Sequence, residues 1–245
     1  MTRYKMEIEY DGTDLVGWQT QKDGLSVEQI IEDAIFKFSH QKTEVYGAGR
    51  TDAGVHAVAQ TAHFDLDTAM SENKLCLAIN ALMSPHPVSV IRVTKVADAF
   101  HARFDAKKRF YVYKILNRRS APALDRNRVW WVSRPLDDEK MRQGAAFLIG
   151  KHDFTSFRSS ECQARSPLKT MDKIDIVRKG DMIEGYFEAR SFLHHQVRNI
   201  MGTLKAVGEG RIEPADVKRI LDAKDRRRAG ITAPACGLYL LGVEY

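Results

Sequence analysis

The stretch EVYGAGRTDAGVHAVAQTAHFDL, residues 44–66, joins two β segments through a glycine-rich loop. Residues 44–46 lead into the loop, and residues 61–66 resume as a strand. Three glycines within eight residues leave the backbone free to turn tightly. The loop carries one carboxylate, Asp52, where a bulky substrate can approach it closely, and Arg50 offers a charge that keeps an acid ionised.

The spacing of the glycines excludes two common kinds of nucleotide site. A phosphate-binding loop needs Lys and Ser or Thr after its last glycine, but Val55 and His56 follow Gly54. A dinucleotide fingerprint needs a third glycine where Asp52 stands, and a carboxylate there would repel a pyrophosphate. On local physics alone Asp52 is most simply a turn residue, because aspartate side chains readily bond nearby backbone N–H groups.

Strand and helix patterns alternate on both sides of this loop. Apolar and polar residues alternate over 4–10, which predicts a strand with one solvated face. Ser26 and Gln29 form a capping box, and the apolar residues after them predict an amphipathic helix ending near Phe38. Further strands are expected at 88–96, 109–116, 174–177, 182–189 and 237–243, a loop at 117–127, and helices at 71–82, 137–148, 197–208 and from Pro214 onward. This mixture favours an α+β fold with an antiparallel sheet covered by helices on one side.

Composition places the chain among ordinary globular proteins. Its 245 residues are 44% hydrophobic and 29% charged, enough for one large or two modest domains. No apolar run near 18 residues and no signal peptide is visible, so we expect neither a membrane span nor secretion. The three cysteines, Cys76, Cys162 and Cys236, lack metal-ligand spacing, which indicates a reduced, cytoplasmic protein without zinc.

Charge is distributed unevenly along the chain. Residues 1–107 contain 11 basic and 15 acidic side chains, whereas residues 108–245 contain 27 and 17. We therefore expect two domains, 1–107 with the Asp52 loop and a basic 108–245. A basic half suits a polyanion such as RNA or DNA, although a solvated basic face is the alternative interpretation. Arg128 and Arg134 add to the basic character of this half, and the candidate contacts are Arg118, Arg119, Arg126 and Arg226–Arg228.

Other candidate sites are weaker. His194 and His195 suggest a metal, but adjacent side chains point apart on a helix or strand, so no metal is expected. Tyr111 and Tyr113 share one face of the 109–116 strand, which is typical of core packing.

Several motifs together resemble one family. The run Gly49–Ala57 resembles the signature of the TruA family of tRNA pseudouridine synthases, whose essential acid is the aspartate of that run. Further blocks resemble the family in the same order and span nearly the whole chain: residues 9–12, 17–19, 100–104, 153–157, 192–200 and 237–240.

The resemblance implies two similar α/β halves that share a largely antiparallel central sheet flanked by helices, with an active-site cleft between them. It also implies an isomerase that converts uridine to pseudouridine at position 38, 39 and/or 40 of the tRNA anticodon stem-loop. The family works as a cytoplasmic homodimer on tRNA, so we expect no DNA or membrane partner. We expect no cofactor either, because isomerisation has no net redox or hydrolytic step.

The resemblance also assigns roles to residues. Asp52 is the expected catalytic acid, acting as nucleophile or as base. Tyr111 is expected to stack on the target base and to assist proton removal. Arg198 is expected to keep Asp52 ionised and Arg50 to contact RNA, although the two arginines could exchange roles.

Two other functions would use some of the same residues. A noncatalytic RNA-binding protein would explain the basic half but would not need Asp52. A nucleoside glycosidase would use a carboxylate near an arginine, but it would release free uracil.

Overall fold

A computed structural model describes the whole chain, residues 1–245. The chain forms two compact units: Met1–Lys107 together with Tyr239–Tyr245, and Lys108–Leu238. The last seven residues therefore belong to the first unit, although the entire second unit separates them from it in sequence. A charge count along the chain cannot indicate this return, because it divides the chain only into continuous parts.

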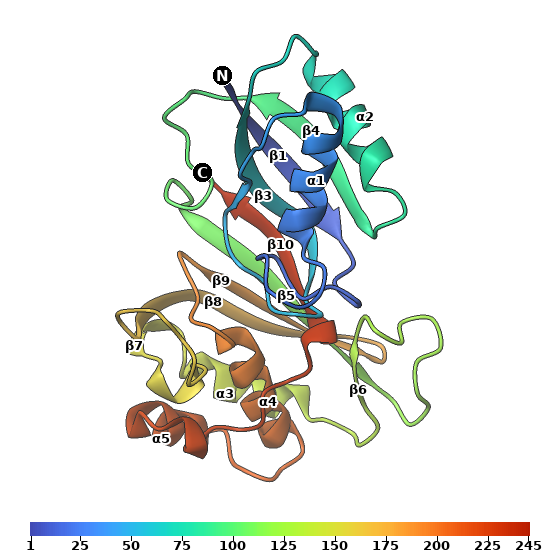
Figure 1. Cartoon of the computed structure of the whole chain (residues 1–245). Coiled ribbons are helices and arrows are strands. Elements are labelled where there is room, and N and C mark those ends of the chain that lie inside the picture. Colours follow the sequence, from blue (N-terminus) through green and yellow to red (C-terminus); the bar gives the residue numbers. More distant parts are fainter. The chain divides into compact units, whose positions relative to one another are not determined.

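A largely antiparallel sheet forms the base of the first unit (Figure 1). Its strand β1 (Thr2–Tyr10) pairs in antiparallel orientation with β3 (His56–Leu66) on one side and β4 (Val88–Lys95) on the other. The short β2 (Tyr46–Gly47) adds to β3 in antiparallel orientation. The returning strand β10 (Leu238–Glu244) pairs with β3 in parallel orientation.

Two helices cover one face of this sheet (Figure 1). α1 spans Val27–Ser39, and Ser26 caps it by accepting a hydrogen bond of 3.1 Å from the Gln29 N–H, as the capping box predicts. α2 spans Glu72–Met83. Each helix buries a stripe of apolar side chains, mostly valine and isoleucine in α1 and Leu75, Ile79 and Met83 in α2, which confirms the two predicted amphipathic helices.

The strands of the second unit also pair in largely antiparallel orientation (Figure 1). β5 (Lys108–Asn117) pairs with β9 (Met182–Ala189), β9 with β8 (Leu168–Lys179), and β8 with β7 (Gly150–Asp153), all antiparallel. The three-residue β6 (Trp130–Val132) adds to β5 in parallel orientation.

Three helices pack in this second unit: α3 (Asp138–Ala146), α4 (Gln196–Gly208) and α5 (Asp216–Ala223). The most buried is α4, which also contacts α3 and β5. Three short 3₁₀ turns complete the chain: η1 (Thr155–Phe157), η2 (Arg226–Arg228) and η3 (Ala235–Gly237).

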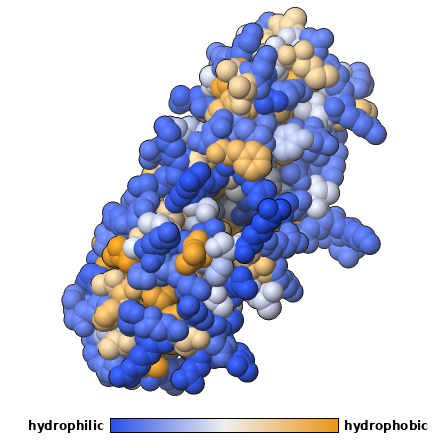
Figure 2. All heavy atoms as spheres, turned by 90° about the vertical axis from the view of Figure 1, so that its left-hand side faces the viewer, coloured by the Kyte–Doolittle hydropathy of each residue, from blue (hydrophilic) through white to orange (hydrophobic).

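The predicted α+β class with mostly antiparallel strands flanked by helices is confirmed. The face drawn in Figure 2 is mostly hydrophilic, and its apolar side chains lie in small groups. None of the helices combines the length and the apolar composition that a membrane span requires.

Candidate active site

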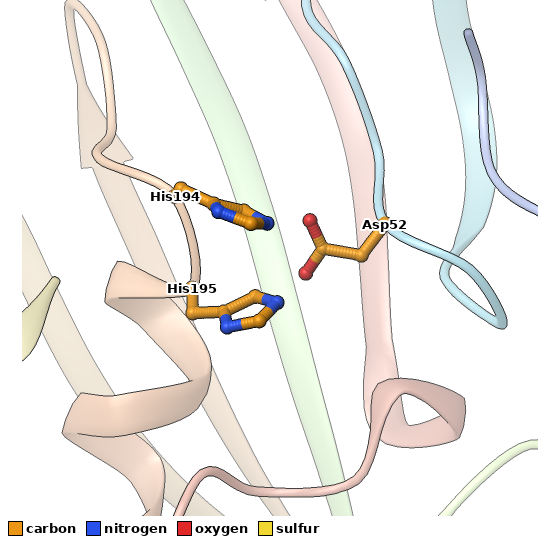
Figure 3. A group of neighbouring side chains, drawn as sticks. All are labelled: Asp52, His194 and His195. Atoms are coloured by element: carbon orange, nitrogen blue, oxygen red, sulfur yellow. The ribbon is translucent and has the colours of Figure 1, made fainter. Parts of the chain in front are cut away.

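Asp52 lies on the loop between β2 and β3, within the first unit (Figure 3). Its side chain is partly exposed, whereas Thr51 before it is buried. A tight turn follows, in which the Val55 N–H donates to the Asp52 carbonyl over 3.1 Å. Gly54 lies inside this turn with a φ of +77°, a conformation that favours glycine. Gly54 therefore allows the turn a backbone conformation that other residues rarely adopt.

The backbone of the loop is fixed by residues from the N-terminal segment. The Tyr10 hydroxyl and Thr51 Oγ1 are hydrogen-bonded at 2.7 Å in the buried interior. The Trp18 N–H donates to the Thr51 carbonyl over 3.1 Å, and the Gly54 N–H donates to the Leu15 carbonyl over 3.3 Å. Asp52 is thus flanked on both sides by anchored backbone.

Glycines of the N-terminal segment allow this close approach. A Cβ on Gly17, whose φ is +103°, would lie 2.4 Å from the Thr51 carbonyl oxygen. A Cβ on Gly12 would lie 2.1 Å from the Val55 carbonyl oxygen. Gly47 of β2, directly before the loop, lies against the Trp18 ring, because a Cβ on Gly47 would lie 2.5 Å from a carbon of that ring. The absence of a side chain at Gly47 therefore allows the Trp18 ring to pack against the backbone there.

His56, at the end of the loop, is a residue that sequence reasoning missed. Its Nδ1 accepts a hydrogen bond of 3.0 Å from the Gly12 N–H and lies 3.1 Å from Asp11 Oδ1. Its ring stacks on Tyr239 of β10 with centroids 4.6 Å apart. The sequence offers no signal for this contact, because Tyr239 is brought close only by the return of the C-terminal strand.

Arg50 lies in the same loop and is exposed. Its guanidinium makes no hydrogen bond or ion pair within the chain. It is available to an external anion.

Tyr111 and Arg198 both lie in the second unit. Tyr111 is on β5, and its ring packs edge-to-face against Phe192 with centroids 5.0 Å apart. Tyr113, two residues along the strand, donates its hydroxyl to the Pro234 carbonyl over 2.7 Å and is fully buried. The core-packing interpretation therefore holds for Tyr113.

Arg198 lies in the first turns of α4. Its Nε donates to the Ala233 carbonyl over 2.8 Å. The Ala233 N–H donates in return to the Arg198 carbonyl over 3.2 Å.

His194 and His195 lie in the turn directly before α4 (Figure 3). Their ring centroids are only 4.0 Å apart, so the prediction that the two side chains point apart is wrong. The cause is the backbone of His195, which is left-handed with a φ of +62° and therefore follows neither helix nor strand geometry. Neither unit by itself brings together three side chains that could bind a metal, and the expected absence of a metal stays a prediction.

Comparisons with known proteins agree on one family. A family model described as tRNA pseudouridine synthase matches residues 6–105 and 145–245. The chain is 52% identical over 245 residues to tRNA pseudouridine synthase A of Paramagnetospirillum magneticum, covering all of this chain and 96% of that protein. It is 51% identical to tRNA pseudouridine synthase A of Parvibaculum lavamentivorans, with both chains covered completely.

An α+β protein with these matches is an isomerase of the pseudouridine synthase class. The chain belongs to the tRNA pseudouridine synthase family, within the TruA group. Its substrate class is therefore tRNA.

Proposed function

We propose that this chain isomerises uridine to pseudouridine at position 38, 39 and/or 40 of the tRNA anticodon stem-loop, with Asp52 as the catalytic carboxylate. The observation that carries the proposal is the loop of Asp52. Its backbone is anchored by Tyr10 and Trp18 on one side of the acid and by the Val55 turn on the other, while the Asp52 side chain stays partly exposed. Such preorganisation suits a group that must meet a substrate in one geometry.

The reaction breaks the N1 glycosidic bond, turns the uracil and rejoins it to the sugar through C5. The C5 proton leaves to solvent and N1 takes up a proton, so substrate and product are isomers. Asp52 acts as nucleophile or as base, and both roles require an ionised carboxylate. We propose Arg198 as the guanidinium that favours this ionised form.

Tyr111 is the proposed stacking partner of the target base. Reaching a base in a stem requires extrusion of the nucleotide, which costs a few kcal/mol, and stacking on an aromatic ring offsets part of that cost. The phenolic hydroxyl can also assist removal of the C5 proton.

The proposed RNA contacts are exposed arginines without a partner inside the chain. Arg50 in the first unit meets this condition, as do Arg119 and Arg126 in the loop between β5 and β6. Arg226 does not, because its guanidinium is bound to groups of the protein. Phosphate contacts of this kind supply affinity and position the RNA.

We also propose that the enzyme works in the cytoplasm as a homodimer. Both statements rest on the family resemblance. Size-exclusion chromatography with light scattering tests the dimer: a mass near twice 27.8 kDa is expected, and a monomer at all concentrations would contradict it.

The function is tested with a tRNA transcript that carries tritium at C5 of uridine. Incubation with the protein should release tritium to water without releasing free uracil. Mapping of pseudouridine in the product should place it at position 38, 39 or 40. Free uracil would indicate a glycosidase instead, and tRNA binding without tritium release would indicate a noncatalytic RNA-binding protein.

A further inference from the structure

Arg226 differs from its two neighbours in the basic run of η2. Arg227 is 90% exposed and pairs with Asp225 over 2.8 Å. The Arg226 guanidinium points into the protein, where Nη1 donates to the Gly230 carbonyl over 2.9 Å. Its Nη2 donates to Asn199 Oδ1 and Thr232 Oγ1, each over 3.0 Å. All these acceptors are neutral, and burial lowers the pKa of Arg226.

Asn199 on α4 connects this guanidinium to the helix. It is fully buried, and its Nδ2 donates to the Phe157 carbonyl over 3.0 Å. Its Oδ1 accepts from Arg226 and also from the Thr232 hydroxyl, at 2.7 Å. Because both ends of the amide are engaged, its orientation is fixed.

The segment after η2, residues 229–233, runs directly along α4. In Figure 1 it forms part of the red stretch that passes α4 on its way from α5 to β10. A Cβ on Gly202 of α4 would lie 1.7 Å from the Ile231 carbonyl oxygen, so the two backbones touch. The Gly230 N–H also donates to Thr203 Oγ1 over 2.9 Å. These contacts set the register of the segment on the helix.

Ala233, at the far end of this segment, contacts Arg198 of α4. Ala233 exchanges two hydrogen bonds with it, one of them from Arg198 Nε to the Ala233 carbonyl at 2.8 Å. A guanidinium is planar, so fixing Nε against one acceptor sets the direction of its two terminal nitrogens.

We propose that Arg226 is a positioning residue that, through Asn199 and the 229–233 segment, sets the direction of the Arg198 guanidinium. The inference rests on the proposed function for its effect on catalysis, though not for the contacts themselves. Arg226 is therefore a structural residue and not one of the RNA contacts that the charge pattern of the sequence predicts.

A kinetic test uses single and double variants at saturating tRNA. Arg226→Ala should lower kcat at least 10-fold with little change in KM. In an Arg198→Ala background the same substitution should change kcat less than 2-fold, because its effect passes through Arg198. Additive losses, or a loss confined to KM, would overturn the inference.

A second pair of variants tests the same hydrogen bonds with smaller changes, which are less prone to cause misfolding. Thr232→Val removes the hydroxyl between Arg226 and Asn199, whereas Thr232→Ser keeps it. We expect Thr232→Val to lose kcat and Thr232→Ser to recover most of it. Arg219→Ala, which breaks an exposed pair with Asp216 on α5, is the control for losing a surface arginine, and equal losses in all of these variants would contradict the proposal.

An NMR measurement tests the positioning without any activity. The Arg198 Nε–H signal, assigned from its loss in Arg198→Lys, should exchange slowly with solvent in the wild type. In folded Thr232→Val and Arg226→Ala it should exchange at least 10-fold faster. Unchanged exchange would overturn the inference, whereas an inactive wild type with this exchange pattern would reject only the proposed function.

Discussion

Gly17 supports the candidate active site although it lies far from Asp52 in sequence. Its φ is positive, which strains any other residue, and a Cβ on Gly17 would lie only 2.4 Å from the Thr51 carbonyl oxygen, so no side chain fits there. We expect Gly17→Ala to destabilise the protein by about 1–3 kcal/mol or more and to lower kcat. Urea unfolding and tritium release measure the two effects.

Gly180, in the turn between β8 and β9, is the matched control for this substitution. It also has a positive φ, +59°, but open space surrounds its ideal Cβ. Gly180→Ala therefore tests backbone strain alone, and it should leave kcat unchanged. Equal effects on kcat at both glycines would contradict the role of Gly17 in shaping the loop.

His63 on β3 should make stability depend on pH. Burial lowers its pKa to about 4, and its Nδ1 accepts a hydrogen bond from the Ala102 N–H. An unfolded histidine titrates near 6.5, so the neutral form stabilises the folded state fully above that pH. This stabilisation is lost as the pH falls from about 6.5 towards 4.

Urea unfolding between pH 7 and pH 4.5 measures this dependence. The wild type should lose on the order of 1–3 kcal/mol more than His63→Gln over this range. His86→Gln, at an exposed histidine, should behave like the wild type. The attribution to His63 fails if His63→Gln keeps the full pH dependence.

The proposed catalytic acid could be identified from the sequence only in part. An aspartate in a glycine-rich turn is usually structural, so Asp52 stood out only because other motifs resembled the family in the same order. The structure gives a physical reason for two of those motifs, since Tyr10, Gly12, Gly17 and Trp18 all contact the loop. His56 and the inward Arg226 could not be predicted, because both depend on contacts between distant segments.

At the level of elements, long periodic segments were predicted well and short ones were not. The helices α1, α2 and α4 follow clear apolar stripes, and their predicted positions are confirmed. β6 and β7 were missed, because three or four residues are too few to show a period and depend on their sheet neighbours.

The cap of α1 gives a prediction at this scale. Ser26 is buried, and its hydroxyl accepts from the Gln29 N–H at the start of the helix. Ser26→Ala should therefore cost about 1 kcal/mol of stability. Ser89→Ala, at an exposed position of β4, should cost almost no stability. Equal urea midpoints for the two variants would contradict a stabilising role of the Ser26 cap.

At the level of the whole molecule, the charge pattern separates surface arginines from structural ones only when the structure is known. Arg119 and Arg126 are exposed without partners in the chain, whereas Arg226 is bound inside it. The return of β10 to the first unit is another whole-molecule feature that the sequence did not indicate. Pairing of segments so distant leaves no local pattern.

The basic second unit should make tRNA binding depend steeply on salt. Each phosphate contact adds roughly one to the slope of log affinity against log salt concentration. Arg126→Ala should therefore weaken binding and reduce that slope by about 1, as measured by filter binding or fluorescence anisotropy. A flat salt dependence of the wild type would contradict the placement of RNA contacts on this unit.

The central claim is that Asp52 carries out pseudouridine formation. The most direct test compares tritium release by the wild type, Asp52→Asn and the exposed-site control Asp67→Asn in single turnovers with enzyme in excess. We predict that Asp52→Asn binds tRNA normally but releases tritium on the order of 10³-fold more slowly or not at all, while Asp67→Asn matches the wild type. An Asp52→Asn rate within 10-fold of the wild type would contradict the claim.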